Sequence, residues 1–331
     1  MERLQSIQKT NTNLYKMEKL RIVFMGTPEF AVATLDKLFQ NSYHIVGVVT
    51  APDKPAGRGR KLNESAVKKY AVAQHIKVLQ PTNLKNEAFL EELSLLKPNL
   101  MVVVAFRMLP KVVWSIPKYG TFNLHASLLP NYRGAAPINW AIINGETETG
   151  ATTFFIDEKI DTGEIILQER TLITNNDTAG ALHDNLMELG ATLVHKTVQL
   201  IETGTVTPVK QKETTALKPA HKIHKETCRI NWELSINEVY NHIRGLSPYP
   251  TAWTNLIDEG KNMPVKIYKA TKELEEHTIK NGILVATKKD LKVAVQGGFI
   301  NLLEIQLPGK RKMAVKEVLN GLKLSEKAYV L

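Results

Sequence analysis

An amide, an imidazole and a carboxylate in the first half of the chain form the set best suited to chemistry. Asn123 and His125 lie two positions apart in the segment 121–125, and Asp161 follows within 160–163. In an extended segment alternate side chains share a face, so Asn123 and His125 should project from the same side. An amide that donates hydrogen bonds, an imidazole that carries a proton and a carboxylate that orients it suit acyl transfer. The sequence offers no covalent nucleophile to match them.

The elements that position these residues follow an alternating pattern of strands and helices. Apolar or alternating segments predict strands at 20–25, 45–50, 100–105 and 121–125, and helical patterns lie near 63–75 and 83–97. Thr27 is expected to cap a further helix, with Pro28 in its first turn. This alternation predicts a Rossmann-like α/β domain whose parallel or mixed sheet is covered on both faces. Ligands of such sheets bind beyond the carboxyl ends of the strands, where Asn123 and His125 fall.

The second part of the chain has a different pattern. An amphipathic helix at 178–203 ends at Gly204, and a basic, polar segment at 208–226 follows as a linker. Beyond it come one helix and several short strands with glycine turns, which together predict a small β-barrel. The expected helix is 235–245, and the expected strands are 252–257, 264–270, 283–286, 291–296 and 299–305. We therefore expect domains at 19–207 and 227–331.

Composition limits the class of protein. An apolar fraction of 43% and a charged fraction of 23% are ordinary for a globular protein. No apolar run approaches the ~20 residues of a membrane span, and the first 18 residues lack the apolar run of a signal peptide. We expect residues 1–18 to be a disordered extension, with Met17 as an alternative start, and the protein to be a cytoplasmic monomer. Cys228 is the only cysteine, which excludes an intrachain disulfide and a cysteine-based zinc site, and no metal is expected.

The positive charge is concentrated in the second part. Residues 208–331 hold 21 Lys and Arg against 13 Asp and Glu, a net charge of +8, whereas residues 1–207 carry only +2. Such an excess favours a polyanionic partner through phosphate neutralisation. A general bias towards solubility would give the same composition.

A basic, glycine-rich loop at 54–61 is a second candidate for phosphate contact. Gly57 and Gly59 make it flexible, and it carries Arg58, Arg60 and Lys61. The loop lacks the spacing of a dinucleotide fingerprint or a P-loop, so a mononucleotide site is disfavoured. A plain solvated loop remains an alternative.

Long motifs give the chain a specific resemblance. They are FMGTPEF at 24–30, DKPAGRGR at 53–60, HASLLPNYRGAAPI at 125–138, GAT at 150–152, IDTG at 160–163 and GLSPYPTAW at 245–253. With these motifs the chain resembles the folate-dependent formyltransferases from about residue 19 into the C-terminal region. Taken singly, Asn123, His125 and Asp161 would each have an ordinary structural explanation. The resemblance makes a shared catalytic role the preferred interpretation.

The resemblance implies a reaction. A formyl group would pass from 10-formyltetrahydrofolate to the α-amino group of methionine on initiator tRNA, giving formylmethionyl-tRNA for translation initiation. Asn123, His125 and Asp161 match the family's catalytic trio. Asn123 and a protonated His125 would stabilise the oxyanion, His125 would also carry the proton, and Asp161 would orient the imidazole and favour its charged form.

The resemblance also implies the binding residues. It assigns folate contacts to Ser127, Leu128, Leu129 and Pro130, and places Phe106, Met108, Leu109 and Asp157 around the pterin. Arg107 departs from the family's usual small residue at its position, so its role is open. For tRNA it implies that the loop with Arg58, Arg60 and Lys61 enters the acceptor stem, while the C-terminal OB-like barrel tracks the backbone. Lys210, Lys222, Lys310 and Arg311 are the expected phosphate contacts there.

Other functions fit parts of the same pattern. A glycinamide ribonucleotide or nucleotide-sugar formyltransferase would share the trio but would not need the basic second domain. Hydrolysis of the formyl-folate by water would use the same three side chains. An RNA-binding module on an inactive scaffold would need the basic residues but not the intact trio.

Overall fold

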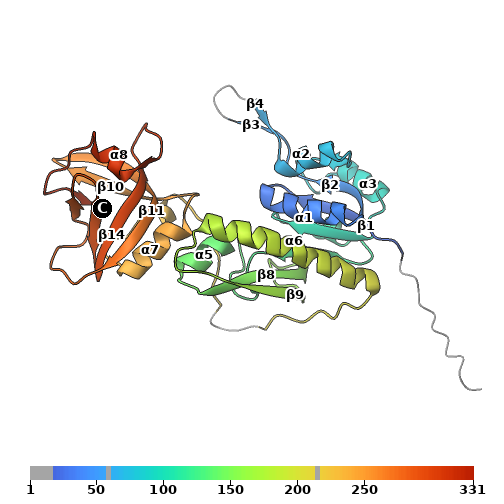
Figure 1. The fold of residues 1–331 in the computed structure, drawn as a ribbon. Coiled ribbons are helices and arrows are strands. Elements are labelled where there is room, and N and C mark those ends of the chain that lie inside the picture. Colours follow the sequence, from blue (N-terminus) through green and yellow to red (C-terminus); the bar gives the residue numbers. More distant parts are fainter. Residues whose placement is uncertain (1–17, 57–60, 213–216) are drawn as a thin grey trace, which may run out of the picture.

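The computed structural model describes residues 18–56, 61–212 and 217–331. Two lobes follow one another along the chain, with the blue-to-green lobe preceding the orange-to-red one (Figure 1). Each lobe has its own apolar core of buried side chains. Within the described residues no helix is both long enough and apolar enough to cross a membrane. The expected extension at 1–18 falls almost entirely outside the described residues.

The first domain is built on a seven-stranded sheet in the order β5-β2-β1-β6-β7-β8-β9. Its strands are β1 (Arg21–Gly26), β2 (His44–Val49), β5 (Val78–Leu79), β6 (Leu100–Val104), β7 (Thr121–His125), β8 (Glu148–Phe155) and β9 (Ile165–Leu172). The first five run parallel, and β8 and β9 are antiparallel additions at one edge. The predicted Rossmann-like mixed sheet is confirmed, whereas strands β5, β8 and β9 were not predicted.

Helices cover both faces of this sheet because the central strands are apolar on both sides. Alternate residues of β1 pack into different cores: Phe24 lies among the residues of one, and Met25 among those of the other. On the first face lie α1 (Glu29–Gln40), α2 (Ala66–Ala73) and the long α6 (Ala179–Thr203); on the second lie α3 (Glu87–Leu95) and α4 (Lys111–Trp114). The short pair β3 (Lys54–Ala56) and β4 (Lys61–Asn63) projects from this domain (Figure 1).

Two helix ends test the sequence predictions. Gly204 ends α6 in the left-handed conformation, with φ 67°, as its position after the amphipathic pattern predicted. The predicted cap by Thr27 is wrong. Pro28 is the N-cap of α1, without a side-chain hydrogen bond, and the helix begins at Glu29. An acidic residue in the first turn complements the helix dipole there, so the helix forms without a hydroxyl cap.

The second domain is a nearly closed antiparallel barrel with two helices against it, α7 (Ile236–Gly245) and the short α8 (Val315–Leu319). Its strands are β10 (Ala252–Asp258), β11 (Lys261–Leu274), β12 (Leu284–Ala286), β13 (Leu291–Val295), β14 (Gly298–Gln306), β15 (Met313–Ala314) and β16 (Tyr329–Val330). The terminal strands of the sheet approach one another, because Val330 N donates to Gly282 O at 2.8 Å and Ile283 bridges to Tyr329. Helix α7 starts at a capping box of Ser235 and Glu238. The predicted barrel is confirmed.

The domains meet along α7 and α5 (Pro137–Ile143). Asn139 Nδ2 donates to Gly245 O at 2.7 Å, and Gly180 N donates to Ser247 O at 3.0 Å. The buried guanidinium of Arg244 donates to the carbonyls of Thr174 and Asp177. These hydrogen bonds to backbone carbonyls fix the second domain against the first close to α5, which also borders the candidate site.

Candidate active site

Strand β7 ends at a cavity of about 710 Å³ beyond the carboxyl ends of the parallel strands. Asn123, His125 and Asp161 all line it. Phe122, one residue before Asn123, is fully buried in the core. The alternation along β7 therefore directs Asn123 and His125 to the cavity side, as the sequence predicted.

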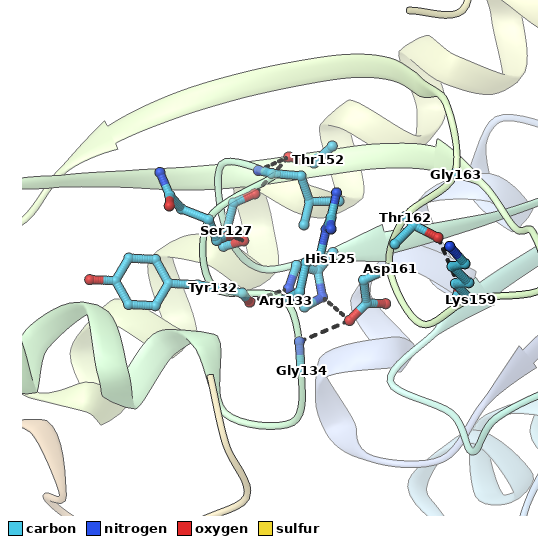
Figure 2. Close-up of polar contacts among 12 residues, drawn as sticks. His125, Ser127, Tyr132, Arg133, Gly134, Thr152, Lys159, Asp161, Thr162 and Gly163 are labelled. Carbon is cyan, nitrogen blue, oxygen red and sulfur yellow. Dashed lines mark hydrogen bonds and ion pairs between the residues drawn. The ribbon is translucent and has the colours of Figure 1, made fainter. Parts of the chain in front are cut away.

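His125 is buried and lies between two oxygen atoms. Its Nε2 is 2.7 Å from Tyr132 O, and its Nδ1 is 3.9 Å from Asp161 Oδ2. The side chains of His125 and Asp161 are only 8% and 14% exposed, so water screens the pair weakly. The Tyr132 carbonyl can only accept a hydrogen bond, so Nε2 donates to it, and the Asp161 carboxylate faces the other ring nitrogen. Figure 2 shows the carboxylate of Asp161 between His125 and Gly134.

Asp161 is held by the backbone around it. Gly134 N donates to Asp161 Oδ2 at 2.9 Å, and Asp161 itself has φ 56°. A left-handed conformation is tolerated by aspartate better than by most residues and occurs preferentially at functional sites. Two positions later, a Cβ on Gly163 would lie 1.6 Å from Phe155 O. Only glycine fits there, so the motif Asp161-Thr162-Gly163 fixes the path by which this loop enters the site.

The segment after β7 is a buried support. Ser127 Oγ donates to Asn131 O at 2.7 Å, and Ser127 O accepts from Thr152 Oγ1 at 2.6 Å. Gln168 Nε2 donates to Leu129 O at 2.9 Å. Ser127 is fully buried, Leu129 nearly so, and none of Ser127, Leu128, Leu129 and Pro130 belongs to the cavity lining. The folate contacts expected of these four residues stay a prediction.

The cavity walls are largely apolar. Phe106, Met108 and Leu109 line one wall, and the loop that contains Asp157 lines another. Met108 and Ile160 stand 68% and 61% exposed on these two walls, which leaves apolar surface for a flat ring to cover. Lys111 and Glu158 join the walls through an exposed ion pair of 2.6 Å.

The hydrogen bonds of Arg107 go to backbone carbonyls of a neighbouring turn rather than to the trio. Its guanidinium donates to Thr82 O at 2.9 Å and to Pro81 O, and it lies 5.7 Å from the centre of the Phe106 ring. The side chain thereby holds the 81–82 turn against the loop that begins at Ala105. A structural brace is the role that these contacts support.

Several lining residues were missed by sequence reasoning. They are Phe30, Pro137, Ile138, Asn139 and His183. Phe30, Pro137 and Ile138 are part of the quoted motifs, so the motifs could have indicated them. His183 comes from the far end of the domain's sequence, on α6, and its ring packs edge-on against Phe30 at 5.2 Å. No local pattern indicates that contact.

The expected tRNA contacts divide into two groups. Arg58 and Arg60 lie outside the described residues, and Lys61 opens β4, where its side chain is not described. Lys210, Lys222, Lys310 and Arg311 are all exposed on the surface. Their exposure is compatible with phosphate contact and does not test it. In the described part of the chain no group of three or more His, Cys, Asp or Glu side chains is arranged to hold a metal ion.

Family comparison defines the class of the protein. Residues 20–198 match the model of the formyl transferase family, and residues 222–323 match the model of the formyl transferase C-terminal domain. The chain therefore belongs to the formyl transferase family, and it carries that family's C-terminal domain.

Two relatives are identical to this chain at more than half of the aligned positions. The chain is 58% identical to a methionyl-tRNA formyltransferase of Flavobacterium johnsoniae, over 95% of this chain and all of that protein. It is 53% identical to a methionyl-tRNA formyltransferase of Bacteroides thetaiotaomicron, over 94% of this chain and 98% of that protein.

Solved structures share the fold at low identity. A sugar 3N-formyl transferase, WlaRD, superposes with a TM-score of 0.63 at 23% identity, covering 89% of this chain and all of that one. HypX from Aquifex aeolicus in complex with tetrahydrofolic acid gives a TM-score of 0.63 at 18% identity, covering 93% of this chain and 49% of that one. Both likenesses bear on the fold alone.

Proposed function

We propose that the protein transfers the formyl group of 10-formyltetrahydrofolate to the α-amino group of methionine on initiator tRNA. The observation that carries the proposal is the meeting of Asn123, His125 and Asp161 in one cavity beyond the strand ends. Identities of 53–58% to methionyl-tRNA formyltransferases over nearly whole chains support the acceptor. We further propose 19–207 as the catalytic unit, 208–226 as the linker and 227–331 as the tRNA-binding unit, acting as a monomer in the cytoplasm.

The three side chains divide the work of the reaction. As the amine forms its bond to the formyl carbon, negative charge develops on the formyl oxygen. The Asn123 amide can donate a hydrogen bond to that oxygen, and the His125 ring can stabilise it by charge. The charged His125 ring gives a proton to the departing folate nitrogen as the old carbon–nitrogen bond breaks, and the neutral ring then takes the proton of the attacking nitrogen, which restores its charge. Asp161 holds the ring and balances its charge across 3.9 Å.

The cavity fits a pteridine in size and character. Its volume of about 710 Å³ lies within the ordinary range of small-molecule sites, roughly 300–1,000 Å³. Phe106, Met108 and Leu109 offer apolar cover, and Asp157 offers polar groups to a ring edge. We propose contacts of Ser127, Leu128, Leu129 and Pro130 with the folate by resemblance alone, because these residues form the layer behind the lining.

The acceptor is assigned from charge and from the relatives. Residues 208–331 carry a net charge of +8, which suits a ligand with many phosphates. We propose that Arg58, Arg60 and Lys61 contact the acceptor stem and that Lys210, Lys222, Lys310 and Arg311 contact the backbone. Arg58→Leu should abolish activity on Met-tRNA and leave folate affinity intact. Equal losses of both would refute this role.

An acceptor competition tests the proposal. Purified protein is incubated with 10-formyltetrahydrofolate carrying a labelled formyl group, together with initiator Met-tRNA, glycinamide ribonucleotide and an aminosugar nucleotide. We expect label in formylmethionyl-tRNA. Label in one of the other amines would assign a different formyltransferase, and release as free formate would assign a hydrolase. Tight tRNA binding without any turnover would indicate an inactive RNA-binding protein.

A further inference from the structure

One side chain of the basic linker, that of Gln211, joins two segments at the active site. Gln211 Nε2 donates to Asp161 O at 2.9 Å and to Gly163 O at 2.8 Å. Gln211 Oε1 accepts from Arg133 Nη2 at 2.6 Å and from Arg133 Nε at 3.1 Å. A glutamine amide has two N–H donors and one carbonyl oxygen with two lone pairs. All of them are used here, so the amide is fully satisfied in one orientation.

Both ends of this amide support the surroundings of His125. The Nε2 end holds the backbone of Asp161, whose carboxylate faces His125 Nδ1. The Oε1 end holds Arg133, which stands between Tyr132 and Gly134. Tyr132 O is the partner of His125 Nε2, and Gly134 N is the donor to Asp161 Oδ2. Gln211 thus contacts Asp161 itself and, through Arg133, the residue next to Tyr132.

The linker itself is anchored on either side of Gln211. Val209 pairs with Ile165 through two backbone hydrogen bonds of 2.8 and 2.9 Å. Further along, Ala220 N donates to Arg133 O at 2.9 Å, and Tyr132 N donates to Lys218 O at 2.6 Å. The described part of this segment therefore borders the active-site loops as an added layer, and the Gln211 side chain contacts both loops.

Gln211 lies between two exposed lysines, Lys210 and Lys212. No ion pair joins either lysine to a carboxylate elsewhere in the described part of the chain. A polyanion that binds Lys210 and Lys212 would therefore lie next to Gln211, whose amide holds the backbone of Asp161.

We propose that Gln211 is a positioning residue: it sets the Asp161 loop and the Tyr132–Gly134 turn around His125, and it links the tRNA-binding linker to the catalytic trio. The proposal rests on the proposed function for its kinetic consequences. The hydrogen bonds themselves can be tested without a substrate.

Two substitutions separate the two ends of the amide. Gln211→Ala removes all four hydrogen bonds. Gln211→Glu keeps acceptors for Arg133, and strengthens them by charge, but it offers no donor to the carbonyls of Asp161 and Gly163. Misplacement of a catalytic group by about 1 Å costs about 10²-fold in rate. We expect both variants to lose about 10²-fold in kcat, with the KM for Met-tRNA within about twofold of the parent.

Neighbouring substitutions provide matched controls. The double variant Lys210→Ala/Lys212→Ala should raise the KM for Met-tRNA and leave kcat nearly unchanged, the reverse of the Gln211 variants. Gln199→Ala removes an exposed glutamine on α6, and it should change neither constant. Thermal unfolding of all variants shows whether Gln211→Glu retains its fold. Loss of kcat in a stable Gln211→Glu protein is the result that a purely structural role would not give.

Hydrogen–deuterium exchange gives the readout without substrate. We expect faster amide exchange within 157–164 in both Gln211 variants and no change in the Gln199 variant. Unchanged exchange there, or a Gln211→Glu protein with parental kcat, would overturn the proposal. Absence of formyl transfer in the parent protein would instead refute the proposed function and leave the exchange result to decide the role of Gln211.

Discussion

Replacing Asp161 with asparagine tests the electrostatic role assigned to this residue. The amide oxygen of asparagine can still accept the hydrogen bond from Gly134 N, so the loop should keep its path. The substitution removes only the negative charge that lies 3.9 Å from His125 Nδ1. Asp161→Asn should therefore lower the rate of formyl transfer without preventing either substrate from binding.

The expected magnitude follows from the distance. At 3.9 Å and an effective dielectric constant of about 20, a pair of unit charges interacts by about 4 kcal/mol. Each ~1.4 kcal/mol of transition-state stabilisation corresponds to a tenfold change in rate, so full loss would cost about 10³. Both side chains are mostly buried, so screening by water reduces this little. We expect a loss of about 10²–10³ in kcat, the lower bound allowing for relaxation of the loop.

The assay is single-turnover transfer of a labelled formyl group at saturating Met-tRNA. Glu164→Gln is the matched control, because this exposed carboxylate follows the same loop and does not line the cavity. It should retain the parental rate. An Asp161→Asn enzyme that also retains the parental rate would refute the charge-stabilising role of the carboxylate.

Three further predictions concern the scaffold and the tRNA surface. Gly163→Ala forces a Cβ against Phe155 O and should destabilise the protein by about 1–3 kcal/mol, seen as a lowered Tm with reduced activity. Burial raises the pKa of Glu146, but hydrogen bonds from Lys218 and Tyr132 and the Lys218 charge outweigh burial and hold that pKa below its usual range. This stabilisation is present above the unfolded carboxyl pKa of about 4.3 and is lost as pH falls through the lower folded value, so Tm measured from pH 6 downwards should show the gap between the parent and Glu146→Gln closing. Lys210→Ala should lower the slope of log affinity against log salt for tRNA by about one unit, measured by titration at several salt concentrations.

Each of these three predictions has a result that would contradict it. A Gly163→Ala protein with parental Tm would mean that the loop shifts freely. A gap between the parent and Glu146→Gln that stays constant into acid would exclude the ionised carboxylate as its source. An unchanged salt slope would remove Lys210 from the phosphate contacts.

The core of the fold was predictable because its elements have strong local patterns. The apolar run of β1 and the amphipathic repeat of α6 each carry their own periodicity, so both appear at nearly the predicted bounds. Strand β9 has no such periodicity, because Ile166 is its one buried residue and the exposed run Gln168–Arg170 lies at the sheet edge. An edge strand with a solvated face gives a weak pattern, and only its pairing with β8 defines it.

The meeting of Asn123, His125 and Asp161 in one cavity was predictable for a different reason. The two-residue spacing of Asn123 and His125 on a strand settles their shared face, and the motif around Asp161 supplied the third member. Gln211 had no such pattern. It lies in a polar segment without periodicity, and its role depends on long-range contacts with Arg133 and Asp161 that no local rule contains.

The most direct test of the account is a transfer experiment that compares the parent with Asn123→Ala. Both proteins receive 10-formyltetrahydrofolate with a labelled formyl group and initiator Met-tRNA, and substrate binding is measured separately. The account predicts that the parent moves one label onto each methionine amine, and that the variant binds both substrates but transfers about 10²–10³ times more slowly. Parental transfer by Asn123→Ala, or no transfer by the parent, would contradict it.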